Sequence, residues 1–362
     1  MGGTEQNYVK EAFDTNWIAP LGPNVTGFEN DLITYLNSDI NVAALSSGTG
    51  AIHLGLQLLG VGRGDEVLCQ SFTFSASANP ILYLGATPIF VDSEKETWNI
   101  SPELLEDAIK NRLKEGIKPK TIVAVHLYGM PYNIKDIHEI AEKYNIPVLE
   151  DSAEALGSTY YGRKCGTFGD IAVLSFNGNK IITTSGGGAL VSKNKEHTDK
   201  AVYLATQARD NAIHYQHSEI GYNYRMSNVL AGIGRGQMEV LDERVFARRA
   251  NYQYYYDNLK AIPEIEFLNE PPGLSSNRWL TCILTPSYEI RECIRLALLD
   301  ENIESRPLWK PMHLQPVFQN YLNFSDGTSE ELFERGLCLP SGSNLLKEDL
   351  TQIVSIIKAA LK

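Results

Sequence analysis

The chain lacks the features that define several protein classes. Its five cysteines are scattered and odd in number and none forms a CxxC pair, so neither a zinc site nor a disulfide framework is indicated. Thirty-two Lys and Arg against 44 Asp and Glu give a net charge of −12, which argues against a nucleic-acid or anionic-membrane surface. No apolar run approaches the ~20 residues of a membrane span, and the first residues lack an apolar signal-peptide core. We therefore expect a cytoplasmic protein with reduced thiols, without a metal and without a nucleic-acid or membrane partner.

Short apolar stretches alternate with amphipathic ones from about residue 40. Strands that alternate with helices indicate an α/β protein with a mainly parallel sheet covered on both sides. A long helix is predicted around residues 235–260, where the pattern changes, and a smaller α+β region follows it. We place a domain boundary near residue 245, which gives a large domain over 1–245 and a small one over 246–362. The predicted strands cover residues 41–45, 66–69, 87–92, 121–126, 148–151 and 171–176.

Lys180 is the most informative residue, because of what surrounds it. It precedes the glycine-rich run 183–188, and both Asp151 and Ser175 stand at the ends of predicted strands. Ligands of such folds bind at the carboxyl ends of the strands. A pyridoxal phosphate site needs a lysine that bonds to the cofactor, an acid for the ring nitrogen and a hydroxyl for the phosphate. The alternatives are a solvated surface lysine at 180 and a helix N-cap at Asp151.

Two further stretches fit the same cofactor. Gly48 and Thr49 lie between a predicted strand and the start of a helix, where backbone N–H groups and the helix dipole favour an anion. Phe72 or Phe74 supplies a flat face for the cofactor ring. The alternatives are an ordinary strand–helix turn and two core phenylalanines.

Several longer motifs resemble a known family. Glu150 to Ser158, Gly166 to Asp170 and Ser175 to Lys180 are similar to the DegT/DnrJ/EryC1/StrS nucleotide-sugar aminotransferases, and the likeness extends from Asn16 to Gly342. Other stretches resemble one branch of that family, the bacterial enzymes that aminate C4 of UDP-4-keto-6-deoxy-N-acetylglucosamine on the way to di-N-acetylbacillosamine. Those stretches are residues 179–188, 206–209, 221–225 and 306–310.

The resemblance implies a type I aminotransferase fold that binds pyridoxal 5′-phosphate (PLP), which alternates with its amine form, PMP. It implies a homodimer with active sites at the interface, where Asn223 reaches the cofactor phosphate of the neighbouring subunit. It assigns ring stacking to Phe74 and the phosphate turn to Gly48 and Thr49. Glu154 occupies a position that is often Gln or His, near the cofactor 3-oxygen, so its carboxylate must be protonated, turned away or compensated.

The resemblance also implies the reaction, with L-glutamate as amino donor and the C4 ketone of a nucleotide sugar as acceptor. A sugar dehydratase of the same fold is the first rival, but those relatives replace the lysine that Lys180 retains. A non-catalytic PLP-binding protein is the second rival, and another UDP-, dTDP- or GDP-linked 4-keto or 3-keto sugar is an alternative substrate. Candidate substrate contacts, each with a surface or packing role as its alternative, are Trp17, Arg225, Arg278, Arg306, Trp309 and His313.

Overall fold

An eight-stranded sheet forms the centre of the molecule. The computed structural model describes residues 1–361. Strand β9 is antiparallel to both of its neighbours and every other pairing is parallel, so the mainly parallel sheet is confirmed. The strand order is β1 (Asn41–Leu45), β9 (Gly188–Ser192), β8 (Ile171–Ser175), β5 (Val148–Asp151), β4 (Thr121–Val125), β2 (Glu66–Gln70), β3 (Thr87–Val91) and β14 (Asn323–Phe324).

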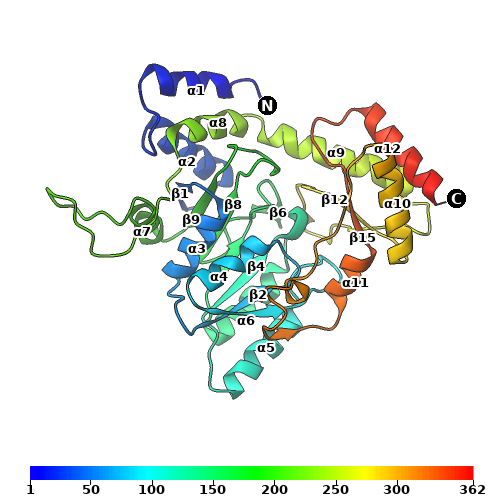
Figure 1. The fold of residues 1–362 in the computed structure, drawn as a ribbon, viewed down its shortest axis with the longest axis horizontal. Coiled ribbons are helices and arrows are strands. Elements are labelled where there is room, and N and C mark those ends of the chain that lie inside the picture. The colour runs from blue at the N-terminus through cyan, green and yellow to red at the C-terminus, as the bar shows by residue number, and fades with distance from the viewer. Residues whose placement is uncertain (362) are drawn as a thin grey trace.

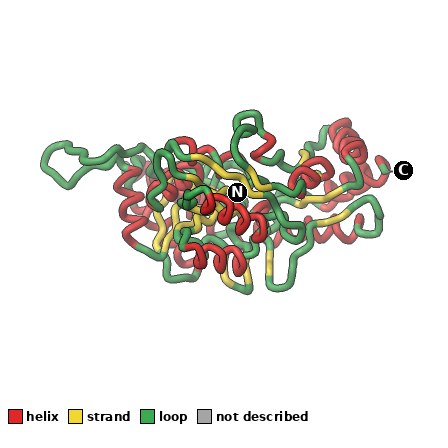
Figure 2. Tube along the Cα trace, turned by 90° about the horizontal axis from the view of Figure 1, so that it is seen from below, coloured by secondary structure: helices red, strands yellow, loops and turns green. Residues whose placement is uncertain are grey.

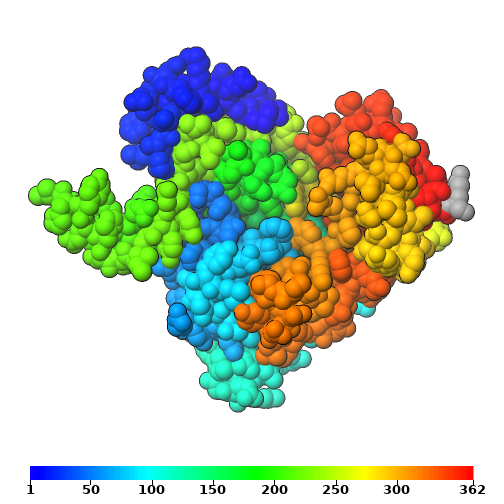
Figure 3. Space-filling model, in the orientation of Figure 1, coloured from blue at the N-terminus to red at the C-terminus, as the bar shows by residue number. Residues whose placement is uncertain are grey.

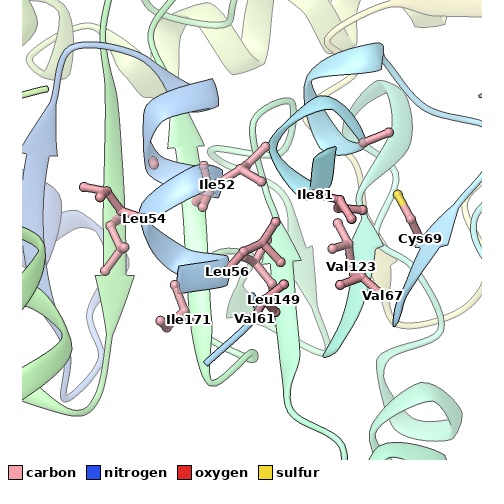
Figure 4. Packing of buried hydrophobic residues seen from close by; sticks show 14 of the residues in the cluster. Ile52, Leu54, Leu56, Val61, Val67, Cys69, Ile81, Val123, Leu149 and Ile171 are labelled. Carbon is pink, nitrogen blue, oxygen red and sulfur yellow. The ribbon is translucent and has the colours of Figure 1, made fainter. Parts of the chain in front are cut away.

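Helices cover both faces of this sheet (Figure 1). Because successive side chains of a strand point to opposite faces, Val67 and Cys69 join one apolar cluster while Leu68 joins another. One face packs against α3 (Gly48–Leu58), α4 (Asn79–Tyr83) and α7 (Lys195–Ala205), as Figure 4 shows for α3. The other face packs against α2 (Pro23–Leu36), α5 (Pro102–Lys114), α6 (Ile134–Tyr144) and α8 (Asn228–Met238). Both strand faces are therefore dry, as an apolar run in a parallel strand requires.

A second, four-stranded sheet lies in the C-terminal part. Its order is β10 (Glu266–Phe267), β12 (Thr281–Leu284), β15 (Gly336–Leu339) and β13 (Arg306–Pro307). Helices α10 (Tyr288–Asp300) and α12 (Lys347–Ala360) pack against it, and α11 (Thr328–Arg335) lies beside it. Two short C-terminal strands belong to other sheets. Strand β14 extends the large sheet, and β11 (Leu274–Ser275) pairs with β6 (Thr159–Tyr160), which forms a hairpin with β7 (Arg163–Lys164).

The helix predicted over residues 235–260 is two helices. Helix α8 ends at Met238, and α9 (Leu241–Leu259) begins after Val240, whose φ of −116° is not helical. The break lies where α1 (Glu5–Asp14) packs on α8, and Glu239 accepts hydrogen bonds there from Thr4 and Tyr8. Tertiary contacts with the N-terminal segment thus accompany a break that the charge pattern does not reveal. Helix α9 continues past residue 245, near which the sequence predicts a domain boundary.

A loop over residues 206–222 projects from the body beside α7 (Figures 2 and 3). Its two ends are joined by a bridge between Thr206 and Asn223, and a second bridge joins Arg209 to His217. Gln207 and Ala208 at its base have positive φ values of 69° and 50°. None of the helices within residues 1–361 is long and apolar enough to cross a membrane.

Candidate active site

Four of the residues predicted to hold a cofactor lie at or next to the carboxyl ends of two neighbouring strands. Asp151 is the last residue of β5, and Ser175 is the last residue of β8. These strands are paired in parallel with Asp151 opposite Val173. Gly48 begins α3, and Lys180 lies in the turn that follows β8. The chain order therefore brings residues more than a hundred positions apart to one edge of the sheet.

Asp151 is buried and oriented by hydrogen bonds. Its Oδ2 accepts from the Ser77 hydroxyl at 2.7 Å, and Ser77 in turn bonds to the Thr73 hydroxyl at 2.8 Å. Its Oδ1 accepts from the Ala153 N–H at 3.1 Å within a turn, not at the start of a helix. A carboxylate fixed in this way is suited to bind a protonated ring nitrogen.

Glu150 forms a polar foundation behind Asp151. It accepts from His126 Nε2 at 2.8 Å, from Ser152 and from three backbone N–H groups, those of residues 166, 168 and 169. Burial alone would raise its pKa, but these hydrogen bonds from His126 and the backbone hold the pKa of Glu150 at about 2. The backbone N–H of His126 donates to Asp151 O at 3.1 Å, so the network supports the end of β5.

The start of α3 provides an anion cradle. The Ser47 hydroxyl caps the helix by accepting from the Gly50 N–H at 3.0 Å. A Cβ on Gly48 would lie 3.0 Å from Ser175 Cβ and 3.1 Å from its Oγ, so the absence of a side chain keeps the space beside that hydroxyl open. The first N–H groups of a helix have no partner within it. Gly48, Thr49 and Ser175 together therefore fit a phosphate group.

Lys180 lies between a carboxylate and an indole ring. Its Nζ is 3.3 Å from Glu154 Oε1 and 4.3 Å from the centre of the Trp279 ring. Glu154 Oε2 accepts from the Tyr128 N–H at 2.7 Å. Burial raises the pKa of the Glu154 carboxyl to about 7, although Lys180 and Tyr128 oppose the shift. Glu154 is thus turned toward Lys180, and its charge is partly suppressed and partly compensated.

Four aromatic side chains, those of Phe74, Tyr128, Trp279 and Trp309, form a cluster that contacts Lys180 through Trp279. Phe74 is 56% exposed and its ring centre is 5.4 Å from that of Trp309. Trp309 donates its backbone N–H to the Tyr128 hydroxyl at 2.9 Å. Trp279 and Tyr128 were not among the residues selected from the sequence. The sequence predicts a role for the arginine of the Asn277–Arg278–Trp279 stretch, and only the fold shows that the tryptophan reaches Lys180.

The structure places the remaining predicted contacts in different surroundings. Arg278 is buried, donates to Leu268 O at 2.7 Å and lies over the Tyr252 ring. His313 is also buried and hydrogen-bonded with Ser71 at 2.6 Å.

Three of the predicted contacts, and the predicted cofactor ligand Asn223, lie nearer the surface. Arg225 donates to Glu29 at 2.6 Å and to Ala44 O at 2.9 Å. Arg306 is exposed and paired with Glu304. Trp17 and Asn223 are exposed, the latter at the base of the 206–222 loop.

Comparisons with known proteins agree with this geometry. Residues 1–358 match the DegT/DnrJ/EryC1/StrS aminotransferase family, and the chain belongs to it. It is 50% identical over 361 residues to a putative pyridoxal phosphate-dependent aminotransferase, EpsN, of Bacillus subtilis, covering 99% of this chain and 93% of that protein. It is 40% identical to the GDP-perosamine synthase of Escherichia coli O157:H7, covering 98% and 95%. The putative sugar aminotransferase Spr1654 of Streptococcus pneumoniae, solved in a PMP form, superposes with a TM-score of 0.91 at 26% identity, covering 99% and 96%.

The protein is accordingly a PLP-dependent sugar aminotransferase by family. Its own residues fit the cofactor in three independent ways. The space beside Gly48 would be filled by a Cβ, the Asp151 carboxylate is held in a buried network, and the Lys180 amine lies between Glu154 and Trp279. The cofactor prediction is thereby confirmed at the level of the family.

Proposed function

We propose that the protein transfers the amino group of L-glutamate to the C4 ketone of UDP-4-keto-6-deoxy-N-acetylglucosamine, giving a UDP-4-amino sugar for glycan biosynthesis in the cytoplasm. The observation that carries the reaction class is the intact Lys180 at a strand-end site that also contains Asp151 and the Gly48 cradle. A sugar dehydratase would have another residue at that position. The choice of sugar rests on the four stretches that resemble the bacillosamine branch.

The proposed roles of the residues follow from their places. Gly48, Thr49 and Ser175 bind the phosphate, and Asp151 keeps the ring nitrogen protonated. The bound cofactor supplies an electron sink for the substrate carbon as its proton leaves. Lys180 takes that proton and returns it at the C4′ carbon of the cofactor, and the same residue reverses the transfer with the keto sugar.

Replacement of Lys180 tests the assigned role. We expect Lys180→Ala to keep the fold and the thermal midpoint of the apo-protein within a few degrees while abolishing turnover. Lys164→Ala is the matched control, because Lys164 also lies over an aromatic ring, that of Tyr35 at 3.2 Å, but belongs to the β6–β7 hairpin and not to the turn that follows β8. Substantial residual turnover in Lys180→Ala would refute the acid–base role.

One assay tests the donor and the sugar together. The PLP-loaded protein is incubated with L-glutamate and, in parallel reactions, with UDP-4-keto-6-deoxy-N-acetylglucosamine or a GDP-linked 4-keto hexose. The GDP sugar is the second candidate, favoured by the 40% identity to a GDP-perosamine synthase. Mass spectrometry and NMR of the sugar nucleotide report amination and its position. If glutamate alone converts the absorbance of the PLP form to that of the PMP form but neither sugar is aminated, the donor stands and both acceptors are rejected.

We also propose a homodimer with shared active sites. The 206–222 loop presents Ile213, Tyr215 and Ile220 to solvent, and such apolar exposure on a projecting segment is typical of an interface. Asn223 follows directly at the base of that loop, and the family resemblance assigns its amide to the cofactor phosphate of the second copy.

A further inference from the structure

Trp279 contacts both the amine of Lys180 and the peptide that precedes it. It is 3% exposed, and its ring centre lies 4.3 Å from Lys180 Nζ. Its indole N–H donates to Asn179 O at 2.8 Å. The opposite partner of the amine is Glu154 Oε1 at 3.3 Å. The lysine therefore has a defined resting place between an acid and a ring face.

The segment that carries Trp279 is held in an uncommon conformation. Arg278 has a φ of 53° although it is buried and not glycine. Such backbone persists only where the surroundings over-determine it. Asn277 holds this backbone conformation in place with three hydrogen bonds. Its Nδ2 donates to Glu154 O at 2.8 Å and to Leu156 O at 2.9 Å, and its Oδ1 accepts from the Trp279 N–H at 2.9 Å. The turn is thus tied to the backbone of the residue that faces Lys180.

We infer that Trp279 is a positioning residue for Lys180: its indole face stabilises the free ammonium form, and its N–H bond fixes the segment on which the lysine moves. The inference rests on the proposed function in one respect: it takes Lys180 as the residue that accepts a proton from the substrate and then returns it. An ammonium over a tryptophan face in a dry site is stabilised enough to change an equilibrium by about two- to thirtyfold. Trp279 therefore determines the position of the Lys180 amine between successive proton transfers.

A purely structural role for Trp279 makes a different prediction. Its ring also packs near Tyr128 and Trp309, with ring centres 6.5 and 6.1 Å apart. If packing were its only role, replacement would lower the stability without a specific change in the chemistry of Lys180. The decisive comparison is therefore between two replacements of Trp279 that remove a similar volume, one of which keeps an aromatic ring while the other does not.

Chemical modification of the cofactor-free protein makes that comparison. Wild type, Trp279→Phe and Trp279→Leu are treated with formaldehyde and cyanoborohydride at pH 7.5, and peptide mass spectrometry gives the methylation rate of Lys180 relative to Lys164. We expect Lys180 in Trp279→Leu to react about two- to thirtyfold faster than in Trp279→Phe, because only Phe keeps a ring face for the unreactive ammonium. Equal rates in the two variants would overturn the inference, since access alone would then explain them. Trp279→Met replaces Leu if the Leu variant does not fold.

The loaded enzyme provides a second readout. In single turnovers with α-deuterated L-glutamate, a misplaced lysine makes proton transfer slower, so the deuterium isotope effect should rise in Trp279→Leu while the KM for glutamate changes little. An unchanged isotope effect would contradict the positioning role. Failure of the proposed function is distinguishable, because wild type would then show no half-reaction while the methylation comparison still stands.

Discussion

Glu154 places a carboxyl group in a buried site. The side chain is buried, and its two oxygens are committed to Lys180 and to the Tyr128 N–H. Because burial raises its pKa from 4.5 to about 7, the folded protein holds a proton between these pH values that the unfolded chain has released. Stability linked to this group is therefore lost as the pH rises from about 4.5 to 7.

The variant Glu154→Gln removes that dependence. We expect the apo-protein of the variant to gain stability relative to wild type as the pH rises from 5 to 8, by up to ~3 kcal/mol. The gain is reduced by the stabilisation that the contact between Lys180 and Glu154 provides in wild type. Urea unfolding at the two pH values measures the difference. Glu334→Gln, at an exposed position on α11, should show no such trend. A stability difference that does not change between pH 5 and pH 8 would show that Glu154 is already ionised in the folded protein at pH 5.

Tyr128 and Trp279 show what the sequence leaves hidden at the residue scale. Tyr128 has a φ of 54°, which is uncommon for a tyrosine, and its N–H is thereby directed to Glu154. Trp279 is about a hundred positions from Lys180 in the chain. Neither contact follows from spacing or local propensity. The first depends on how the chain turns after β4, and the second depends on how the C-terminal segment returns to the sheet. Asp151 and Ser175 were predictable because strand ends in a parallel sheet face one edge.

At the scale of elements, the buried strands were the most predictable parts. Strands β1, β2, β3, β4, β5 and β8 lie within a residue or two of the predicted ranges, because dry strands appear as short apolar runs. Strand β9 was missed, since its sequence begins at Gly188 directly after a glycine-rich turn. The short strands of two residues carry no periodic signal, and the break between α8 and α9 is associated with contacts to the N-terminal segment. Their positions are therefore properties of tertiary packing.

The start of α3 provides a test at the same scale. In Gly48→Ala the new Cβ would lie 3.0 Å from Ser175 Cβ, so the helix start or the serine must shift where the phosphate is expected. We expect PLP to bind about tenfold or more weakly, while the apo-protein keeps its thermal midpoint, because alanine is well tolerated in a helix. Absorbance titration gives the Kd. Gly62→Ala is the control, because a Cβ there meets nothing within 4 Å, and equal affinity in both variants would remove Gly48 from the phosphate site.

At the scale of the whole molecule, the 206–222 loop projects from the body of the protein (Figure 3). Ile213 is 105% exposed and Ile220 is 83% exposed, so folding of one chain leaves both in water. A second copy is the occupant that the shared-site proposal requires. We expect the double variant Ile213→Asp, Ile220→Asp to weaken the dimer and lower turnover together, as measured by light scattering and assay. Ile117→Asp, just after α5, should change neither property, and a dimer that survives the double variant would assign the interface elsewhere.

Mixing two damaged subunits tests whether the sites are shared. Suppose Asn223→Ala lowers activity about tenfold through loss of a hydrogen bond to a charged phosphate. Random re-association with Lys180→Ala subunits then makes half of the dimers mixed. In each mixed dimer, one site combines the intact Lys180 of one chain with the intact Asn223 of the other, so the mixture should recover about a quarter of wild-type activity. If Asn223 served its own chain, no site would have both residues, and recovery would stay near a twentieth, about half that of the Asn223→Ala protein. The activity of the mixture relative to wild type therefore shows whether Asn223 serves its own site or that of the partner, because a folding defect in either variant cannot raise the activity of the mixture.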